Sequence, residues 1–313
     1  MSAPGNTLRD GCHLSDNHSL VAGALSTATI AETVWKRQVA VADQSSPINV
    51  VQHPFVFRLL EVVRSQWLTP RMVRVTLGSE ALAGFRSDAA DDGARLFFPP
   101  DPLDASWAPS VDGTSLVFPG ERPPGREYTP RRYDPAAGEL DFDFVVHGDG
   151  DGPAAFWARN AVEGHYLGLS GPRRSRVVAG AVEWYMLAGD ETGLPSIGRR
   201  LEGLAAGTPV FAVLEVADAS EEQPLPSAAD LHLTWLHRDD VAPDDTGQLA
   251  RTLAQLTLPD GPGFAWAAGE ASAMRVVRRH WLRERGLPDT RMRVTGYWKR
   301  AIPNYDHHLP LDE

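Results

Sequence analysis

One short stretch of the sequence combines side chains suited to binding a flat, phosphorylated ligand. It reads Arg126-Glu127-Tyr128-Thr129-Pro130-Arg131-Arg132-Tyr133 and follows a Pro/Gly-rich turn at residues 119–125. An aromatic ring can lie against a heterocycle, while guanidinium and hydroxyl groups hold a phosphate and a ring edge. Solvated arginines and tyrosines packed in a barrel explain the same composition equally well. The stretch alone therefore leaves both interpretations open.

A glycine-rich loop, His147-Gly148-Asp149-Gly150-Asp151-Gly152-Pro153-Ala154, is a second candidate. Pro153 suits the first turn of a helix, and exposed amides before a helix favour an anion site. A calcium loop is not favoured, because Pro153 falls where a third ligand is expected and no glutamate closes the loop. His147 is either a histidine at a strand end or part of the anion site.

Two further loops follow predicted strands, at residues 189–194 and 269–272. In a parallel sheet, ligands bind at the carboxyl ends of strands. Neither loop is a Walker sequence or a complete G-x-G-x-x-G pattern, so each is a weak signal by itself. The pair Asp190-Glu191 suggests acid/base hydrolysis, but adjacent side chains diverge and no Ser/His nucleophile arrangement accompanies them.

The composition limits the classes of function. The 313 residues, 42% hydrophobic and 23% charged, are typical of a soluble globular protein with two domains. The single cysteine, Cys12, excludes a disulfide framework, a thiolate zinc site and a protein-ligated iron–sulfur cluster, and Cys12-His13 is a poor metal pair. Redox chemistry therefore requires a bound cofactor.

The charge and hydropathy patterns limit partners and location. A net charge of -11 argues against general nucleic-acid binding. No apolar run approaches the ~20 residues of a membrane span. The mildly apolar residues 20–25 lack the basic flank of a secretory signal. We expect a cytoplasmic monomer.

The elements that must position these residues form two groups. Residues 1–52 lack a hydrophobic period and predict a mobile or weakly helical extension. An antiparallel β-barrel is predicted over residues 53–178, where alternation indicates strands with one face in solvent. An α/β domain with a parallel sheet is predicted over residues 179–313. The barrel strands are expected at 55–63, 72–77, 95–98, 115–118, 126–133 and 140–146, and the later strands at 184–188, 209–216, 231–237, 264–268 and 291–298, with helices at 196–204, 246–256 and 272–285.

Five ordered motifs resemble the siderophore-interacting proteins, which are flavin-dependent ferric-siderophore reductases with a ferredoxin-reductase-like fold. They lie in family order between about residues 55 and 300, and only the N-terminal extension is left uncovered. The resemblance implies that the barrel binds FAD and that the α/β domain is of the NAD(P)H type. The motifs are Arg126-x-Tyr128-Thr129-x-Arg131, His147-Gly148 with Gly152-Pro153-Ala154, Gly189-Asp190-Glu191-Thr192-x-Leu194-Pro195, Trp266-Ala267-Ala268-Gly269-Glu270 and Gly296-Tyr297-Trp298-Lys299-Arg300.

The resemblance also implies roles for individual residues. Arg126 would meet the FAD pyrophosphate, Tyr128 would pack on the isoalloxazine, and Thr129 would reach its N5 edge. The related reductases often carry a cysteine beside the nicotinamide, and Ala268 near that place excludes a cysteine-assisted hydride step. The other expected contacts are His147, Gly152, Pro153 and Ala154 for FAD, and Asp190, Glu191, Thr192, Gly269 and Glu270 for the nicotinamide.

Basic residues gather near the end of the chain. Residues 271–300 carry many arginines against only Glu284 and Asp289, although a solvated helix face explains the helix arginines as well. Lys299 and Arg300 follow the last predicted strand. With Arg173 and Arg174 they are expected to attract an anionic ferric chelate. Some members of the family that the sequence resembles clamp the substrate with lysines. Lysine is scarce in this sequence, so arginines would have to take that role here.

The predicted mechanism passes a hydride from NADH or NADPH to FAD and single electrons from FAD to Fe(III) in a siderophore. No protein acid, nucleophile or metal ligand is required, because the cofactor carries the chemistry. Ferredoxin is an alternative electron donor. Glu215 favours NADH and Arg238 favours a 2'-phosphate, so these cues conflict. Two other functions fit the same fold: a general NAD(P)H:flavin or quinone reductase, and a siderophore-binding flavoprotein without turnover.

Overall fold

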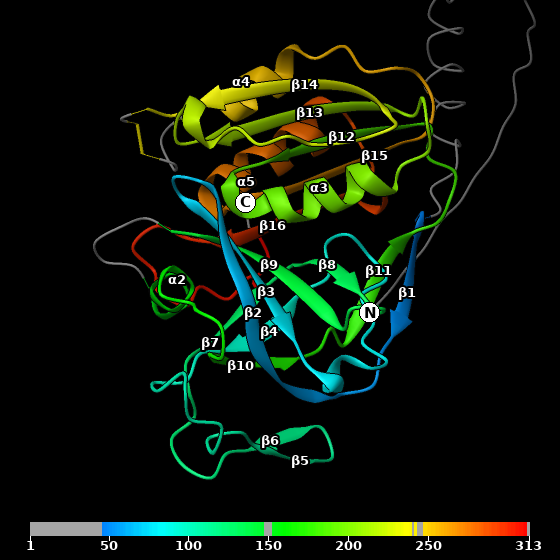
Figure 1. Cartoon of the computed structure of the whole chain (residues 1–313). Coiled ribbons are helices and arrows are strands. Elements are labelled where there is room, and N and C mark those ends of the chain that lie inside the picture. The colour runs from blue at the N-terminus through cyan, green and yellow to red at the C-terminus, as the bar shows by residue number, and fades with distance from the viewer. Residues whose placement is uncertain (1–45, 147–151, 240, 243–246, 312–313) are drawn as a thin grey trace, which may run out of the picture. The chain divides into compact units, whose positions relative to one another are not determined.

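The computed structural model describes residues 46–146, 152–239, 241–242 and 247–311. Two different sheets dominate it (Figure 1), a seven-stranded antiparallel sheet followed by a five-stranded parallel sheet. Both belong to one compact unit, Ser45–Glu313. The predicted order of an antiparallel barrel and a parallel α/β sheet is confirmed. Among the described residues, no helix has the length and apolar character that crossing a membrane requires.

The antiparallel sheet curls because its two edge strands are neighbours in the chain. The strand order is β7-β4-β10-β2-β3-β9-β8, and a single residue, Thr129, separates the edges β7 and β8. One strand had been predicted over 126–133. Pro130 interrupts it because a proline has no N–H for the sheet. The strands are β2 (Phe57–Thr69), β3 (Met72–Gly78), β4 (Ala94–Phe97), β7 (Gly125–Tyr128), β8 (Pro130–Asp134), β9 (Glu139–Val145) and β10 (Tyr166–Ser170).

Inside the curl, alternating apolar residues of these strands form a core with Phe85 and Trp157. The alternation had predicted that the opposite side of β9 lies in solvent, but this side is buried as well. Asp141 and Asp143 are buried there beneath arginines, and Arg74 donates two hydrogen bonds to Asp143, of 2.6 and 2.8 Å. Charge pairing allows this face to be covered although its residues are polar.

Smaller elements complete the first half of the unit. β1 (Ile48–Gln52) pairs with β11 (Arg174–Val178), so the last five residues of the predicted extension belong to a sheet. β5 (Ser110–Asp112) and β6 (Ser115–Val117) form a separate hairpin, and α2 (Pro153–Arg159) starts at the predicted proline. A short 3₁₀ turn, η1, spans Glu80–Leu82. The domain boundaries at 52/53 and 178/179 stay a prediction.

The parallel sheet has the strand order β14-β13-β12-β15-β16. The chain therefore adds β13 and β14 on one side of β12 and then β15 and β16 on the other side. Apolar residues of α3 pack on one face, and those of α4 and α5 on the other. The strands are β12 (Trp184–Gly189), β13 (Pro209–Val216), β14 (Asp230–His237), β15 (Gly263–Glu270) and β16 (Met292–Trp298), and the helices are α3 (Leu194–Gly203), α4 (Gln248–Gln255) and α5 (Ala271–Arg279), with short turns η2 (Glu191–Gly193), η3 (Ala219–Glu221), the π-helical η4 (His280–Glu284) and η5 (Asp289–Arg291).

A buried aspartate joins the two sheets. Asp91, from the loop before β4, accepts a hydrogen bond from Trp266 Nε1 at 3.0 Å. Its carboxylate also lies 3.2 Å from Arg200 Nη2 and 2.9 Å from Arg293 Nε. Helix α3 adds a second connection, since Arg199 donates to the Ser87 carbonyl at 2.9 Å.

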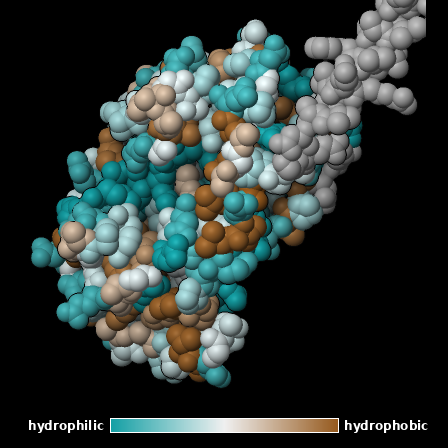
Figure 2. Space-filling view, turned by 90° about the vertical axis from the view of Figure 1, so that its right-hand side faces the viewer, coloured by the Kyte–Doolittle hydropathy of each residue, from teal (hydrophilic) through white to brown (hydrophobic). Residues whose placement is uncertain are grey.

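On the face shown in Figure 2, hydrophilic residues gather in the recess between the upper and the lower part of the molecule as it is drawn there.

Candidate functional site

A cleft of about 1990 Å³ lies between the curled sheet and the parallel sheet. Its walls include β4 and β7, the start of α2, the beginning of β11, and the segment after β16. This volume exceeds the roughly 300–1,000 Å³ of a typical small-ligand pocket. The cleft therefore has room for a large cofactor together with a second ligand.

Arg126, Tyr128 and Thr129, from the stretch at residues 126–133, all line this cleft. The Tyr128 ring packs on Phe144, with centroids 4.5 Å apart, and burial raises the pKa of its hydroxyl. Arg126 donates to the Gly125 carbonyl at 2.9 Å, and burial lowers the pKa of its guanidinium. Among the described residues no carboxylate forms an ion pair with Arg126. A partly desolvated cation of this kind is suited to an anionic ligand.

Thr129 stands where the barrel meets the parallel sheet. Its Oγ1 lies 3.0 Å from Ser196 Oγ on α3, and Ser196 Oγ lies 3.4 Å from the Tyr297 hydroxyl on β16. Burial, with the nearby Asp91 charge, raises the pKa of Tyr297 to about 12. The phenol is therefore a hydrogen-bond donor at neutral pH. Three hydroxyls thus meet at the wall of the cleft, where Thr129 and Tyr297 line it and the buried Ser196 lies behind them.

The turn before α2 also reaches the cleft. Gly152, Pro153 and Ala154 line it, and a Cβ built on Gly152 would meet nothing within 4 Å. The backbone at Gly152 is thus open to close approach by a ligand. The other two residues of this motif, His147 and Gly148, lie outside the described residues.

The loop after β12 is built mainly from contacts within the protein. Asp190 Oδ2 accepts hydrogen bonds from the Glu270 amide and Trp298 Nε1, both 2.8 Å, and so ties the ends of three strands together. A Cβ on Gly269 would approach Asp190 Oδ2 to 2.7 Å, which explains this glycine without a ligand. Asp190, Gly269 and Glu270 are not among the residues that line the cleft, whereas Thr192 is.

Glu270 has a local structural role as well. Its Oε2 accepts from the Ala273 amide at 3.0 Å and also from the Ser272 amide, so it caps the N-terminus of α5. A carboxylate at this position satisfies amides that have no partner within the helix. The cap explains the Gly269-Glu270 motif as a device that starts α5 next to the strand end.

The two cues to nicotinamide preference are bound to each other. The Arg238 guanidinium, 8% exposed, forms a bidentate pair with Glu191, and Glu215 Oε2 lies 3.9 Å from its Nη1. These carboxylates raise the pKa of Arg238 although burial acts in the opposite direction. Neither Glu215 nor Arg238 lines the cleft. The conflict between the cues therefore carries no information about the 2'-phosphate.

The basic lining of the cleft is larger than the sequence indicated. Arg173 and Arg174 belong to it, and Arg173 also lies 5.3 Å from the centre of the Phe55 ring. Burial, together with repulsion from Arg293 and Arg174, lowers the pKa of Arg176. Sequence reasoning missed several of these side chains because they come from separate elements. The arginines not anticipated in the cleft are Arg95, Arg122, Arg176, Arg278 and Arg293.

Lys299 and Arg300 lie at the turn that follows β16. The Lys299 carbonyl accepts from the Ile302 amide at 3.1 Å, and the Arg300 amide donates to Glu270 Oε1 at 3.4 Å. Neither residue is among those that line the cleft, although Trp298 and Ile302 on either side of them are. The structure thus brings Arg173 and Arg174 into the cleft and leaves Lys299 and Arg300 next to it.

The last residues of the stretch at residues 126–133 contact other groups of the protein. Arg131 pairs with Glu202 on α3, with hydrogen bonds of 3.0 and 2.5 Å. Arg132 donates to Asp141 at 3.0 Å, and the Tyr133 hydroxyl donates to the Leu82 carbonyl at 2.8 Å. None of the three lines the cleft. They hold the barrel and its contact with α3.

His53, Ser175 and Asp92 are linked by hydrogen bonds and contain the three residue types of a hydrolase triad. His53 Nε2 lies 2.7 Å from Ser175 Oγ, and Ser175 donates to Asp92 at 2.6 Å. A catalytic triad needs the imidazole between the serine and the carboxylate, but here the serine is in the middle and fully buried. This arrangement supports a structural role for the three residues.

Two protein-family descriptions match the sequence. "Siderophore-interacting FAD-binding domain" matches residues 61–176, in the antiparallel half, and "Siderophore-interacting protein" matches residues 182–301, in the parallel half. Among curated proteins, the chain is 31% identical over 262 residues to the ferric vibriobactin reductase ViuB of Vibrio cholerae, covering 82% of this chain and 96% of that protein. It is 37% identical over 253 residues to the NADPH-dependent ferric-chelate reductase of Escherichia coli, covering 79% and 95%.

Solved structures agree with these matches. A siderophore utilization protein from T. fusca superimposes with a TM-score of 0.77 and 42% identity, over 84% of this chain and 100% of that chain. The flavohem-like FAD/NAD-binding domain of a Vibrio cholerae nitric oxide dioxygenase has a TM-score of 0.55 at 15% identity, over 76% and 98%, and shows the fold alone. The ferredoxin-reductase-like fold is confirmed. The chain belongs to the siderophore-interacting protein family.

Proposed function

We propose that this protein is an FAD-dependent ferric-siderophore reductase, which uses electrons from NADPH or NADH to convert a bound Fe(III) chelate to Fe(II). The observation that carries this proposal is the arginine-lined cleft, on which the Arg126-x-Tyr128-Thr129 strand and the chain after β16 converge. The activities after which the two reductase relatives are named support it.

The side chains of the cleft fit FAD. Arg126, desolvated and without a carboxylate partner among the described residues, suits a pyrophosphate. Tyr128 offers an aromatic surface beside the hydroxyl of Thr129, which suits the polar edge of a ring system. The open backbone at Gly152 allows phosphate oxygens to approach the start of α2. When bound, FAD supplies the exchange between two-electron and one-electron transfer, for which the side chains have no group.

The remaining wall suits the electron donor and the iron chelate. We assign the nicotinamide to the side with Thr192, next to the strand ends held by Asp190, Gly269 and Glu270. The chelate is assigned to Arg173 and Arg174, with Lys299 and Arg300 beside the cleft. Fe(II) is less charged and softer than Fe(III), so hard oxygen donors release it more readily after reduction.

The assignment of Arg174 predicts a charge-selective effect. Arg174→Glu is expected to raise the KM for an anionic ferric chelate on the order of tenfold, because it reverses a charge that attracts the substrate. The KM for a neutral acceptor is expected to change much less. Arg279→Glu is the matched control, since Arg279 is an exposed arginine of α5 that does not line the cleft. An equal rise for both acceptors would contradict an electrostatic role.

Lys299 and Arg300 are tested in the same assay. The double variant Lys299→Glu with Arg300→Glu should raise the KM selectively for the anionic chelate if both groups attract it from beside the cleft. Unchanged kinetics with normal flavin content would remove these two residues from the proposed substrate site.

Anaerobic stopped-flow spectroscopy tests the activity itself. Mixing the flavin-loaded protein with NADPH or NADH is expected to bleach the flavin absorbance, and a ferric hydroxamate or catecholate is expected to restore it. Each nicotinamide carries two electrons and each Fe(III) accepts one, so two Fe(II) should form per nicotinamide oxidised. If no ferric chelate reoxidises the reduced flavin, the reductase proposal fails.

The same experiment separates the other functions. Faster reoxidation by a quinone or free flavin than by any ferric chelate would favour a general reductase. Absence of bleaching by both nicotinamides would indicate ferredoxin as the donor, or a siderophore-binding protein without turnover. Addition of reduced ferredoxin distinguishes the last two.

A further inference from the structure

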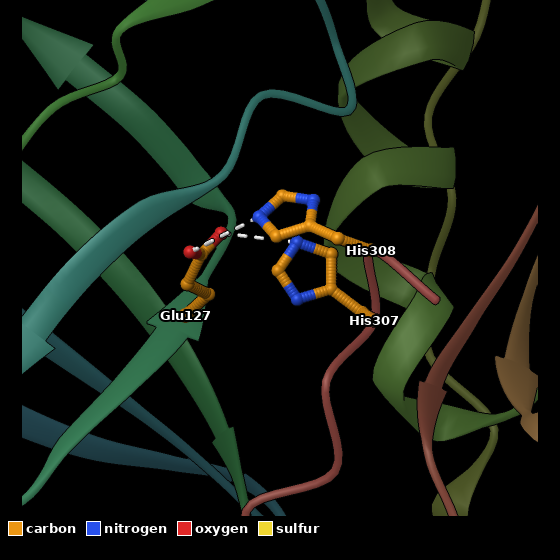
Figure 3. A group of neighbouring side chains, drawn as sticks. All are labelled: Glu127, His307 and His308. Atoms are coloured by element: carbon orange, nitrogen blue, oxygen red, sulfur yellow. Dashed lines mark ion pairs between the residues drawn. The ribbon is translucent and has the colours of Figure 1, made fainter. Parts of the chain in front are cut away.

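Three side chains with metal-ligand chemistry meet at the rim of the cleft (Figure 3). Glu127 comes from β7, and His307 and His308 come from the segment that follows β16. His307 Nε2 lies 3.2 Å from Glu127 Oε2, and His308 Nε2 lies 3.9 Å from Glu127 Oε1. Both imidazole rings face the carboxylate (Figure 3), and their centroids are 4.0 Å apart. Residues distant in sequence thus converge on one point.

The C-terminal segment is shaped so that it presents these imidazoles. Asp306 Oδ1 accepts from the His308 amide at 2.9 Å, and the Asp306 carbonyl accepts from the Leu309 amide at 3.1 Å. Beyond this turn, Leu311 packs against the core beside α5. The segment is therefore anchored on the parallel-sheet side, while its histidines reach a strand of the barrel.

We propose that Glu127, His307 and His308 form a binding site for one divalent first-row transition-metal ion. Two imidazoles and one carboxylate suit Fe(II), Co(II), Ni(II) or Zn(II), whereas Mg²⁺ and Ca²⁺ prefer oxygen ligands. The potential ligand atoms all lie within 4.8 Å of one another. Ligand atoms at about 2.0–2.2 Å from a zinc ion lie roughly 3–3.6 Å apart, so small side-chain rotations would close the site.

The surroundings leave room for further ligands. The His308 side chain is 63% exposed, and those of Glu127 and His307 are partly exposed. Water or a donor atom of the substrate can therefore complete the coordination shell. Because Glu127 belongs to the barrel and the histidines follow the parallel sheet, a bound ion would fasten the C-terminal segment across the rim of the cleft.

A divalent ion with this coordination chemistry can reach the site from two sources. It can come from solution, or it can be the Fe(II) produced in the same cleft. The second source rests on the proposed reductase function, whereas the site itself does not. Imidazole ligands favour Fe(II) over the harder Fe(III) that oxygen chelators hold, so the site is suited to the product more than to the substrate.

Isothermal titration calorimetry of the full flavin-loaded chain with Zn²⁺, free of any affinity tag, tests the site. We expect one Zn²⁺ per chain, affinity at least about tenfold weaker in Glu127→Gln and in His307→Ala with His308→Ala, and no binding of Mg²⁺. His232→Ala is the matched control, because His232 is an exposed histidine 3.5 Å from Asp230, outside this group. Wild-type protein without a Zn²⁺ site, or variants with unchanged affinity, would overturn the proposal.

Further measurements separate the possible failures. Flavin content and the unfolding temperature show whether the variants are folded, and hydrogen exchange of residues 299–311 should slow when Zn²⁺ binds. Anaerobic titration with Fe(II) tests the product ion without any turnover. After turnover with a ferric chelate, desalted wild type should retain about one iron per chain and the double histidine variant should not. If Fe(II) binds in the titration but no Fe(II) forms in turnover, the reductase proposal fails and the metal site stands.

Discussion

Replacing Asp91 with alanine is expected to lower the free energy of unfolding by about 3–5 kcal/mol, the typical cost of removing one partner from a buried ion pair. Asp91 is 6% exposed and contacts Arg200, Arg293 and Trp266 at the junction of the two sheets. Without the carboxylate, two guanidinium groups remain close together with one counter-charge fewer. In a chain of this size the change corresponds to a fall in Tm of roughly 10 °C.

The measurement is thermal or urea unfolding of flavin-free protein, because Asp91 also lines the cleft and loss of cofactor would itself lower the Tm. Asp91→Asn should be intermediate, since an amide oxygen can still accept from Trp266. The control is Asp260→Ala, an aspartate exposed in the loop before β15. A loss of less than 1 kcal/mol in Asp91→Ala would show that the arginines find other partners.

The stabilisation by Asp91 also has a predicted pH dependence. Burial acts to raise the pKa of Asp91, but Arg293 and Arg200 outweigh it and lower the pKa below its ordinary value. A carboxyl group with a lowered pKa in the folded state stabilises the fold above its unfolded pKa, about 3.9. This contribution is lost as the pH falls toward the folded pKa. The difference between wild type and Asp91→Ala should therefore be full at pH 6 and shrink below about pH 4.

Arg126→Ala is expected to weaken FAD binding about 10- to 100-fold, because a hydrogen bond to a charged group contributes about 1.5–3 kcal/mol. Arg126 is half-buried in the cleft wall, and its guanidinium donates to the neighbouring Gly125 carbonyl. The affinity is measured by adding FAD to the flavin-free protein and following flavin fluorescence. The purified variant should also have a lower ratio of flavin to protein absorbance.

Arg64→Ala provides the control for this prediction. Arg64 is also a strand arginine of the barrel, but it is 51% exposed and pairs with Glu139 away from the cleft. A surface pair of this kind contributes about 0–1 kcal/mol, so neither flavin affinity nor Tm should change much. Equal flavin binding by Arg126→Ala and Arg64→Ala would move the pyrophosphate away from Arg126.

Much of the secondary structure could be predicted because local patterns specify it. The predicted strand at 209–216 has the bounds of β13, and the helix at 196–204 differs from α3 only at its ends. β10 was missed because Gly168 breaks its apolar pattern. The fold requires that glycine, since a Cβ there would approach the Trp107 ring to 2.6 Å. β1 and β11 were missed because each is stabilised mainly by its pairing with the other.

The candidate site divides in the same way. Arg126, Tyr128, Thr129 and the turn at Gly152 could be found because each lies in a short motif, and all of them line the cleft. Arg238 and Glu215 were misread because each was considered alone, whereas in the fold they lie within one buried charge cluster. Asp91 and the group of Glu127 and the two histidines had no local signal, because their partners are far away in the sequence.

The sequence by itself determined the family, the two kinds of sheet and the motifs at the cleft, because hydrophobic periods and short motifs act over a few residues. The tertiary structure decided which charged groups face the cleft and which neutralise one another. Ion pairs, hydrogen bonds and metal ligands depend on distances of a few ångströms between residues that only folding brings together. For that reason the five additional arginines of the cleft, the Asp91 junction and the Glu127–His307–His308 group became apparent only in three dimensions.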